Sequence, residues 1–286
     1  MAARVTTRSE HKAGGILLAL PALLWLGLFF LLPLIIVLII SLMSRGSGGS
    51  AVLPFTFDQY TRVFDTFWIV LQRSILVALL TTAICLVAGY PLAYFITRRK
   101  TAFGRQFALF LVILPFWTNF LIRTYAWRVI LGREGLVNNA LLNAGLITEP
   151  LTLLNTEFAV VLGLVYGFLP FMVLPIYASL SRFDHRYIEA ANDLGANDVT
   201  SFWRIMLPLT MPGVIAGCIL VFIPAIGTFV TSDLLGGTRG LMIGNLIQNQ
   251  YSGNGNMPLG AALSVVMMMV VVVALLFYAR FGEEKK

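Results

Sequence analysis

Long apolar runs separated by short polar segments dominate the pattern of this 286-residue chain. A helix needs about 20 mostly apolar residues to cross the roughly 30 Å hydrocarbon core of a bilayer. Six runs meet or approach that length: 16–43, 74–97, 106–122, 158–180, 209–231 and 258–278. The third is the shortest, and Pro115 and Asn119 interrupt it. The pattern therefore predicts an all-α membrane protein with six transmembrane helices.

The polar segments between the runs do not predict a folded extramembrane domain. Residues 44–73 begin with SRGSGGS, which predicts a flexible linker by composition. The following FTFDQYTRVFD predicts a helix lying at the membrane interface. In the next outer segment, apolar residues recur at helical spacing and predict a short surface helix: Leu136, Ala140, Leu141 and Ala144.

Composition and charge agree with a membrane protein and fix an expected orientation. Only 12% of the residues are charged, against about 25% in soluble domains. Most of the 20 Lys and Arg residues fall in segments 1–15, 98–105, 181–208 and 279–286. Because cytoplasmic loops are enriched in these cations, we expect both termini in the cytoplasm and segment 44–73 in the periplasm. The net charge of +7 is then a topology signal, and we expect no nucleic acid partner.

The basic residues before run 16–43 are typical of a secretory signal, but the run itself is too long for one. A signal peptide has an apolar core of 7–15 residues. We therefore expect residues 1–15 to form a cytoplasmic N-terminus and residues 16–43 to form an uncleaved first helix.

The fifth run is rich in helix-breaking residues: Pro212, Gly213, Gly217, Pro224 and Gly227. The Gly213-xxx-Gly217 spacing allows another helix to approach closely. Proline frees backbone carbonyls, and such breaks persist in a membrane where protein or water satisfies them. The pattern indicates a helix that lines a passage, or alternatively ordinary bundle packing.

The polar stretch YIEAANDLGANDVTSFWRIMLPLTMPG, at 187–213, predicts two short helices. Asp184 is a good N-cap for the first helix, and Gly195 stands where a left-handed C-cap is needed. Asp198 is the expected cap of the second helix, which leads into run 209–231 without a clear break. The first helix carries an apolar stripe, formed by Tyr187, Ile188, Ala191 and Leu194. Such a stripe needs a surface to pack on, either the chain's own bundle or a partner protein.

The residues for several kinds of chemistry are missing. The sequence has two histidines and no Gly-Lys-Ser/Thr phosphate-binding loop, so we expect neither a membrane enzyme nor a self-contained ATPase of that type. A proton-coupled carrier would place ionisable groups deep in the bilayer. Asp233, at the outer end of the fifth run, is the carboxylate nearest to a pathway along that helix. An ATP-independent carrier is therefore the more remote alternative.

The polar stretch resembles the cytoplasmic EAA loop of ABC-importer permeases at every defining position: Glu189, Ala190, Ala191, Gly195, Ile205, Leu207 and Pro208. The resemblance implies the type I ABC importer permease fold, with a transmembrane domain at 70–278, a cytoplasmic coupling loop at 181–208 and a cytoplasmic tail at 279–286. It further implies that these residues couple the chain to an ATP-binding subunit. ATP and magnesium would be bound by that partner, and the chain itself would need no cofactor or metal.

A narrower resemblance extends along most of the chain. Four blocks are similar to the first permease subunit of spermidine/putrescine importers: LPFWTNFLIRTYAW, GLVYGFLPFMVLPIYASL, LPLTMPGVIAGC and SDLLGG. This resemblance implies a bacterial inner-membrane protein that works with a second homologous permease, two ATP-binding subunits and a periplasmic substrate-binding protein, surrounded by membrane lipids.

A polyamine cargo would need carboxylates or aromatic faces, since cations bind to both. The candidates for the substrate pathway are Trp117, Tyr125, Trp127 and Asp233. Trp and Tyr also collect at membrane interfaces as anchors, and Arg123 beside them argues against a path that attracts cations throughout. Another small organic cation, an amino-acid derivative or a metal chelate remains an alternative cargo.

Overall fold

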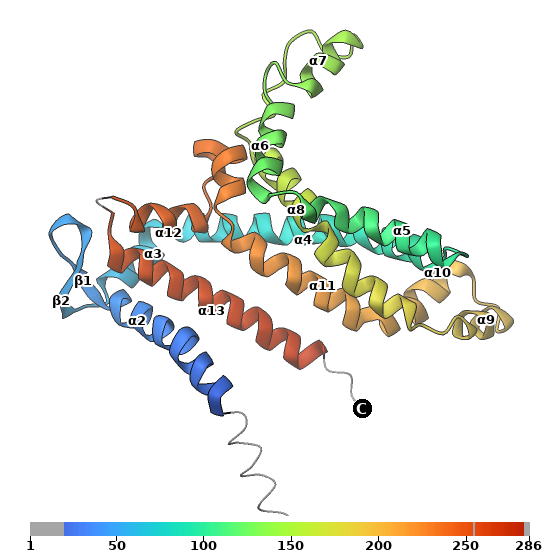
Figure 1. Cartoon of the computed structure of the whole chain (residues 1–286), viewed down its shortest axis with the longest axis horizontal. Helices are drawn as coiled ribbons and strands as arrows, with labels where there is room; N and C mark the ends of the chain where they lie inside the picture. Colours follow the sequence, from blue (N-terminus) through green and yellow to red (C-terminus); the bar gives the residue numbers. More distant parts are fainter. Residues whose placement is uncertain (1–19, 254, 283–286) are drawn as a thin grey trace, which may run out of the picture.

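The computed structural model describes residues 20–253 and 255–282, and its helices are consistent with six membrane spans (Figure 1). Within that part of the chain, five helices are long and apolar enough to cross a membrane: Leu20–Ser41, Trp68–Thr97, Glu157–Ser181, Asp198–Gly227 and Met257–Leu276. The sixth span is a broken pair, Ala102–Trp117 and Phe120–Ile130, bent by 89°. The expected segment 1–15 and the start of the first helix lie outside the described residues, as does the end of the tail.

The helices and strands follow one another along the chain with these bounds: α2 Leu32–Ser41, β1 Met43–Arg45, β2 Ala51–Phe55, α3 Asp58–Thr66, α4 Trp68–Thr97, α5 Ala102–Ile113, α6 Phe120–Ile130, α7 Leu136–Asn143, α8 Glu157–Ser181, α9 Arg186–Asp193, α10 Asp198–Ser201, α11 Leu207–Gly227, α12 Ile243–Tyr251 and α13 Met257–Gly282. Helices α4, α8 and α11 pack together as the centre of the bundle. Helices α2 and α13 lie beside one another at its edge (Figure 1).

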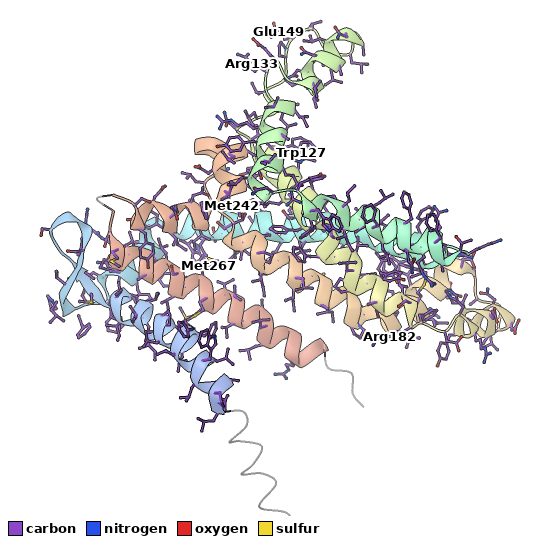
Figure 2. All side chains as sticks on the ribbon, viewed as in Figure 1. Trp127, Arg133, Glu149, Arg182, Met242 and Met267 are labelled. Atoms are coloured by element: carbon purple, nitrogen blue, oxygen red, sulfur yellow. The ribbon has the colours of Figure 1, made fainter. Side chains whose placement is uncertain are left out.

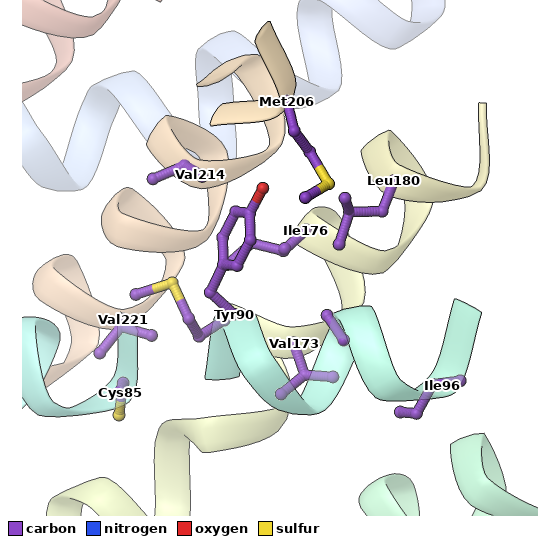
Figure 3. Close-up of a cluster of buried hydrophobic side chains, with 11 residues drawn as sticks. Cys85, Tyr90, Ile96, Val173, Ile176, Leu180, Met206, Val214 and Val221 are labelled. Carbon is purple, nitrogen blue, oxygen red and sulfur yellow. The ribbon is translucent and has the colours of Figure 1, made fainter. Parts of the chain in front are cut away.

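Side chains from the three central helices form the largest buried cluster (Figure 3). Tyr90 of α4 lies in the middle of it, and its hydroxyl is 2.9 Å from the hydroxyl of Thr210 on α11. Thr210 also donates to the carbonyl of Met206 at 2.8 Å, so this buried polar group is satisfied. The cluster therefore joins α4 and α11 by a specific polar contact as well as by apolar packing.

The glycines of α11 permit a close approach to α8, as the sequence predicted. A Cβ added at Gly213 would lie 2.5 Å from the Cβ of Ser179, and one added at Gly217 would lie 2.8 Å from the sulfur of Met172. Both distances are shorter than any real Cβ contact. Only glycine therefore lets these two helices pack at this separation.

The predicted third span over 106–122 is not one straight helix, because the chain turns sharply within it. Leu114–Trp117 forms a tight helical turn that contains Pro115, whose ring cannot continue an α-helix. Asn119 then starts a new helix, its side chain accepting a hydrogen bond from the N–H of Leu121 at 2.8 Å. Helices α6 and α7 consequently project away from the bundle (Figure 1).

The predicted flexible linker is wrong. Strands β1 and β2 pair as an antiparallel hairpin across the SRGSGGS segment. The N–H of Gly46 donates to the carbonyl of Ser50 at 2.7 Å, and Gly48 and Gly49 adopt positive φ angles of 70° and 84° in the turn. Glycine is abundant here because the turn requires left-handed backbone. The two short helices predicted in the outer segments, by contrast, are present as α3 and α7, and their position at the membrane surface stays a prediction.

Candidate coupling hairpin and pathway residues

Helix α9 ends as its sequence predicts and begins one residue later, at Arg186 after His185. The carboxylate of the predicted cap residue Asp184 still accepts a hydrogen bond from the N–H of Arg186 at 3.0 Å, which satisfies one free donor of the first turn. At the other end, Gly195 has a φ of 85°, its N–H donates to the carbonyl of Asn192 at 2.9 Å, and the N–H of Ala196 donates to that of Ala191 at 3.0 Å. These two bonds form a Schellman motif, the helix end that glycine favours most.

The second helix of the hairpin is capped one residue earlier than predicted. Asn197, rather than Asp198, accepts a hydrogen bond from the N–H of Thr200 at 2.8 Å. Asn197 has extended backbone angles, whereas Asp198 is already in the first helical turn, where its negative charge is favourable. From there the chain stays helical over Asp198–Gly227, through a π-helical turn at Phe202–Met206.

The hairpin is fastened to the bundle at several points. Phe202 meets the ring of Tyr90 edge-on, with 5.5 Å between ring centroids. The hydroxyl of Ser201 donates to the side-chain oxygen of Asn192 at 3.3 Å, which ties the second helix to the first. Ile188 packs against the central cluster. The hairpin and α11 are therefore joined to the bundle by both packing and hydrogen bonds.

The apolar stripe of α9 is divided between the bundle and the outside. Ile188 is half-buried and Ala191 is 8% exposed, so these two residues face inward. Tyr187 is 58% exposed and Leu194 is 90% exposed. The chain's own bundle thus covers only part of the stripe: Tyr187 meets the ring of Phe183, at 6.2 Å between centroids, and Leu194 stays almost fully exposed.

The residues that match the family loop differ in their exposure, and they fall into three sets. Glu189, Ala190 and Gly195 are exposed on the hairpin, and a Cβ added at Gly195 would meet no atom within 4 Å. Ala191 is buried instead, so within this chain it packs α9 onto the bundle. The residues that lead into α11 lie close to the protein surface: Ile205 and Leu207 are half-buried, and Pro208 is exposed.

The four candidate pathway residues are not gathered in one place. Trp117 lies at the bend between α5 and α6, 76% exposed, and meets Phe110 edge-on. Tyr125 and Trp127 lie on α6. Trp127 meets the ring of Tyr166 on α8 (Figure 2 labels Trp127). Trp127 also packs on a cluster that contains Leu235, a residue of the π-helical turn η5 (Ser232–Gly236). Asp233 is exposed in that same turn, so Trp127 and Asp233 come from neighbouring elements.

Arg123 is held at the bend by contacts within the chain. Its guanidinium donates to the carbonyl of Pro115 at 2.8 Å. It also lies 5.5–5.7 Å from the ring centroids of Phe116, Phe120 and Tyr166. Arg123 therefore has a structural role, because it fastens α6 to the bend and to α8.

The sequence reasoning missed an ion pair between Arg73, in the first turns of α4, and Glu157, the first residue of α8. Both side chains line a hollow of about 940 Å³ between α4 and α8, whose other walls are mainly apolar, such as Leu76 and Val161. The only sequence signal was one charge at the start of each of two spans, which does not reveal a pairing.

The described residues offer no site for metal chemistry. Residues 20–253 and 255–282 hold no group of three or more His, Cys, Asp or Glu side chains that could bind a metal ion. What the bundle offers instead is a set of close-packed helices with a rigidly attached hairpin at one end.

Comparison with known proteins identifies this arrangement. Residues 85–283 match the family model of the binding-protein-dependent transport system inner membrane component. The chain is 42% identical to the spermidine/putrescine transport system permease protein PotB of Haemophilus influenzae, with 90% of each chain covered. It is 44% identical to the protein of the same name from Escherichia coli K12, with 90% of this chain and 93% of the relative covered.

A solved structure shows the same fold at low sequence identity. A chain of a bacterial ABC transporter involved in the import of the acidic polysaccharide alginate superposes with a TM-score of 0.72 at 19% identity, covering 96% of this chain and 98% of that one. The fold is thus that of type I ABC importer permeases. The protein belongs to the family of binding-protein-dependent transport system inner membrane components, and it is a multi-span permease of the inner membrane.

Proposed function

We propose that this chain is the permease subunit of an ATP-driven importer of polyamines, spermidine or putrescine or both. The observation that carries the proposal is the identity of 42–44% over 90% of the chain to permeases named for spermidine and putrescine transport. Similarity of that extent includes the bend at Trp117, α6 and η5, which hold the candidate pathway residues. The likeness to the alginate transporter, at 19% identity, supports the fold and carries no information about cargo.

The importer requires further subunits, because this chain has no phosphate-binding loop for ATP. A second homologous permease completes the pathway, two ATP-binding subunits hold ATP and magnesium, and a periplasmic binding protein delivers the cargo. The chain itself is not an enzyme and holds no cofactor. Both termini and the segment 181–208 lie in the cytoplasm, and helices two to six form a transmembrane domain at about 70–278.

Helix α9 is the proposed contact with the ATP-binding subunit. Glu189, Ala190 and Gly195 form its small, exposed surface, and Tyr187 and Leu194 add exposed apolar area. Ala191 is buried under this surface and packs α9 onto the bundle. The residues Ile205, Leu207 and Pro208 hold the segment through which the hairpin continues into α11. Because the helix continues from Asp198 to Gly227, a displacement of the hairpin moves α11 with it.

The outer ends of α6 and α11 are the proposed cargo contacts. Asp233 supplies a carboxylate for an ammonium group, and Trp117, Tyr125 and Trp127 supply aromatic faces. The exposure of Asp233, Trp117 and Tyr125 supports this assignment, because each is accessible to a ligand or to the second permease. The Arg73–Glu157 pair lines the hollow between α4 and α8, where a cationic cargo would compete with Arg73 for the carboxylate.

Reconstitution in vesicles tests the proposal. The chain is purified with its associated subunits, and ATP-dependent uptake of radiolabelled spermidine and putrescine is measured with the cognate binding protein. We expect saturable uptake that requires both ATP and the binding protein. Uptake of another organic cation or an amino-acid derivative in place of polyamines would keep the importer class and overturn the cargo. Purification without a nucleotide-binding subunit would overturn the importer itself.

A further inference from the structure

The turn between α4 and α5 combines positive charge with an apolar hollow. Arg98, Arg99 and Lys100 are exposed and line a cavity of about 700 Å³. The other walls include Phe95 from the end of α4, and Phe107 and Leu111 from α5. Because α4 and α5 belong to membrane spans, the turn lies where the hydrocarbon core gives way to water.

The three cations have no carboxylate partner inside the described part of the chain. Arg98 donates to the hydroxyl of Tyr94 at 2.8 Å, and the guanidinium of Arg99 lies 3.8 Å from the ring centroid of Phe95. Neutral partners hold the side chains in position and leave their charge uncompensated. A cluster of this kind attracts anions at the membrane surface.

The walls of the cavity divide by depth. The cations belong to the turn that follows α4, beyond Thr97, whereas Phe95 lies on α4 and Phe107 and Leu111 lie on α5, inside the helices that are candidate membrane spans. All three of these apolar side chains are exposed in the chain. A ligand that fills the hollow therefore needs an anionic end and an apolar end, which are the two parts of a phospholipid.

We propose that this cavity binds an anionic phospholipid, with its phosphate between Arg98, Arg99 and Lys100 and an acyl chain along Phe95 and Phe107. The site is separate from the coupling hairpin and from the cargo pathway. It does not depend on which solute the importer carries.

A soluble partner subunit is the competing occupant. The turn lies at the same end of the bundle as α9 and α10, since Ile96, Phe183 and Phe202 share one cluster (Figure 1). A partner there could supply acidic side chains. It would not extend to Leu111, about two and a half turns along α5 and within a candidate membrane span, whereas an acyl chain can run along that helix. The apolar half of the cavity therefore favours the lipid.

Native mass spectrometry of the full-length chain, purified with the subunits that accompany it, tests the proposal. The protein is titrated in detergent with phosphatidylglycerol and, separately, with phosphatidylcholine of the same acyl chains. We expect preferential retention of phosphatidylglycerol. Each cation near an anionic headgroup is worth about fivefold in binding, or about 1 kcal/mol. Arg99→Gln and Lys100→Gln should therefore each reduce retention of phosphatidylglycerol by about fivefold.

Arg105→Gln is the matched control. Arg105 is exposed on the same end of α5, but it does not line the cavity. We expect its loss to change retention by less than twofold. Equal losses in Arg99→Gln and Arg105→Gln, or equal retention of the two lipids by the original chain, would overturn the proposal. So would unchanged lipid retention in Arg99→Gln together with a reduced yield of the ATP-binding subunit, because the turn would then be a protein contact.

Discussion

The left-handed glycine at the end of α9 offers a sharp test of the coupling hairpin. Gly195 has a φ of 85°, and a Cβ at this position would meet no atom of the chain within 4 Å. The structural cost of replacing it is therefore backbone strain alone. A residue with a Cβ loses about 1–2 kcal/mol in this conformation, and a β-branched residue loses the most, whereas asparagine tolerates it better. Gly195→Val should weaken the native turn by about 5- to 30-fold, and Gly195→Asn by much less.

Binding of the ATP-binding subunit to purified permease is the assay, with cargo-stimulated ATP hydrolysis by the reconstituted importer as a second readout. If docking needs the native turn, the apparent affinity for the ATP-binding subunit falls in proportion to the fraction of permease molecules that keep that turn. We expect both the affinity and the stimulated hydrolysis to decrease from the original chain to Gly195→Asn and further to Gly195→Val. Wild-type behaviour in Gly195→Val would refute the reasoning that the turn geometry matters. Equal and complete loss in both variants would show that the partner requires the bare glycine surface itself.

Three further outcomes follow from contacts in the bundle and at its outer end. Tyr90→Phe should lower the free energy of unfolding by about 1 kcal/mol, since the bond to Thr210 is lost while Thr210 keeps its bond to Met206; an unchanged melting temperature would contradict this. Gly213→Ala should lower the melting temperature despite the better helix propensity of alanine, whereas Gly27→Ala, with nothing within 4 Å, should not; equal effects would deny the close approach of α11 to α8. Asp233→Asn should reduce polyamine uptake while basal ATP hydrolysis and subunit assembly persist, and unchanged uptake kinetics would remove this carboxylate from the pathway.

Features that depend on neighbouring residues were predictable from the sequence. The spans follow from their apolar length, and the C-terminus of α9 follows from one glycine at the correct position. Its N-terminal cap at Asp184 is equally local. The cap of the second helix was placed one residue late, because Asn197 and Asp198 are adjacent and both are good caps.

Features that depend on distant residues were not predictable. The pairing of Arg73 with Glu157 joins two helices that are far apart in the sequence. The β1–β2 hairpin looked like a linker, since its glycines signal flexibility in composition but serve a turn once two short strands pair. Pro115 and Asn119 indicated an interruption in the third run, but neither residue reveals a bend of 89°. For the candidate site, the sequence located the hairpin correctly and could not show that Ala191 faces inward.

If a partner subunit moves the hairpin, as proposed, the helical stretch from Asp198 to Gly227 acts as a lever. Its 30 residues, at 1.5 Å each, span about 45 Å, which exceeds the roughly 30 Å hydrocarbon core by about 15 Å, and we take this excess to lie on the hairpin side. If the lever pivots at the middle of the bilayer, its hairpin end lies about 30 Å from the fulcrum and its other end about 15 Å. A tilt of about 10° then moves the hairpin by about 5 Å and the far end by half as much. Force applied at the hairpin is correspondingly doubled at the far end, which suits a small, strong opening of tightly packed helices.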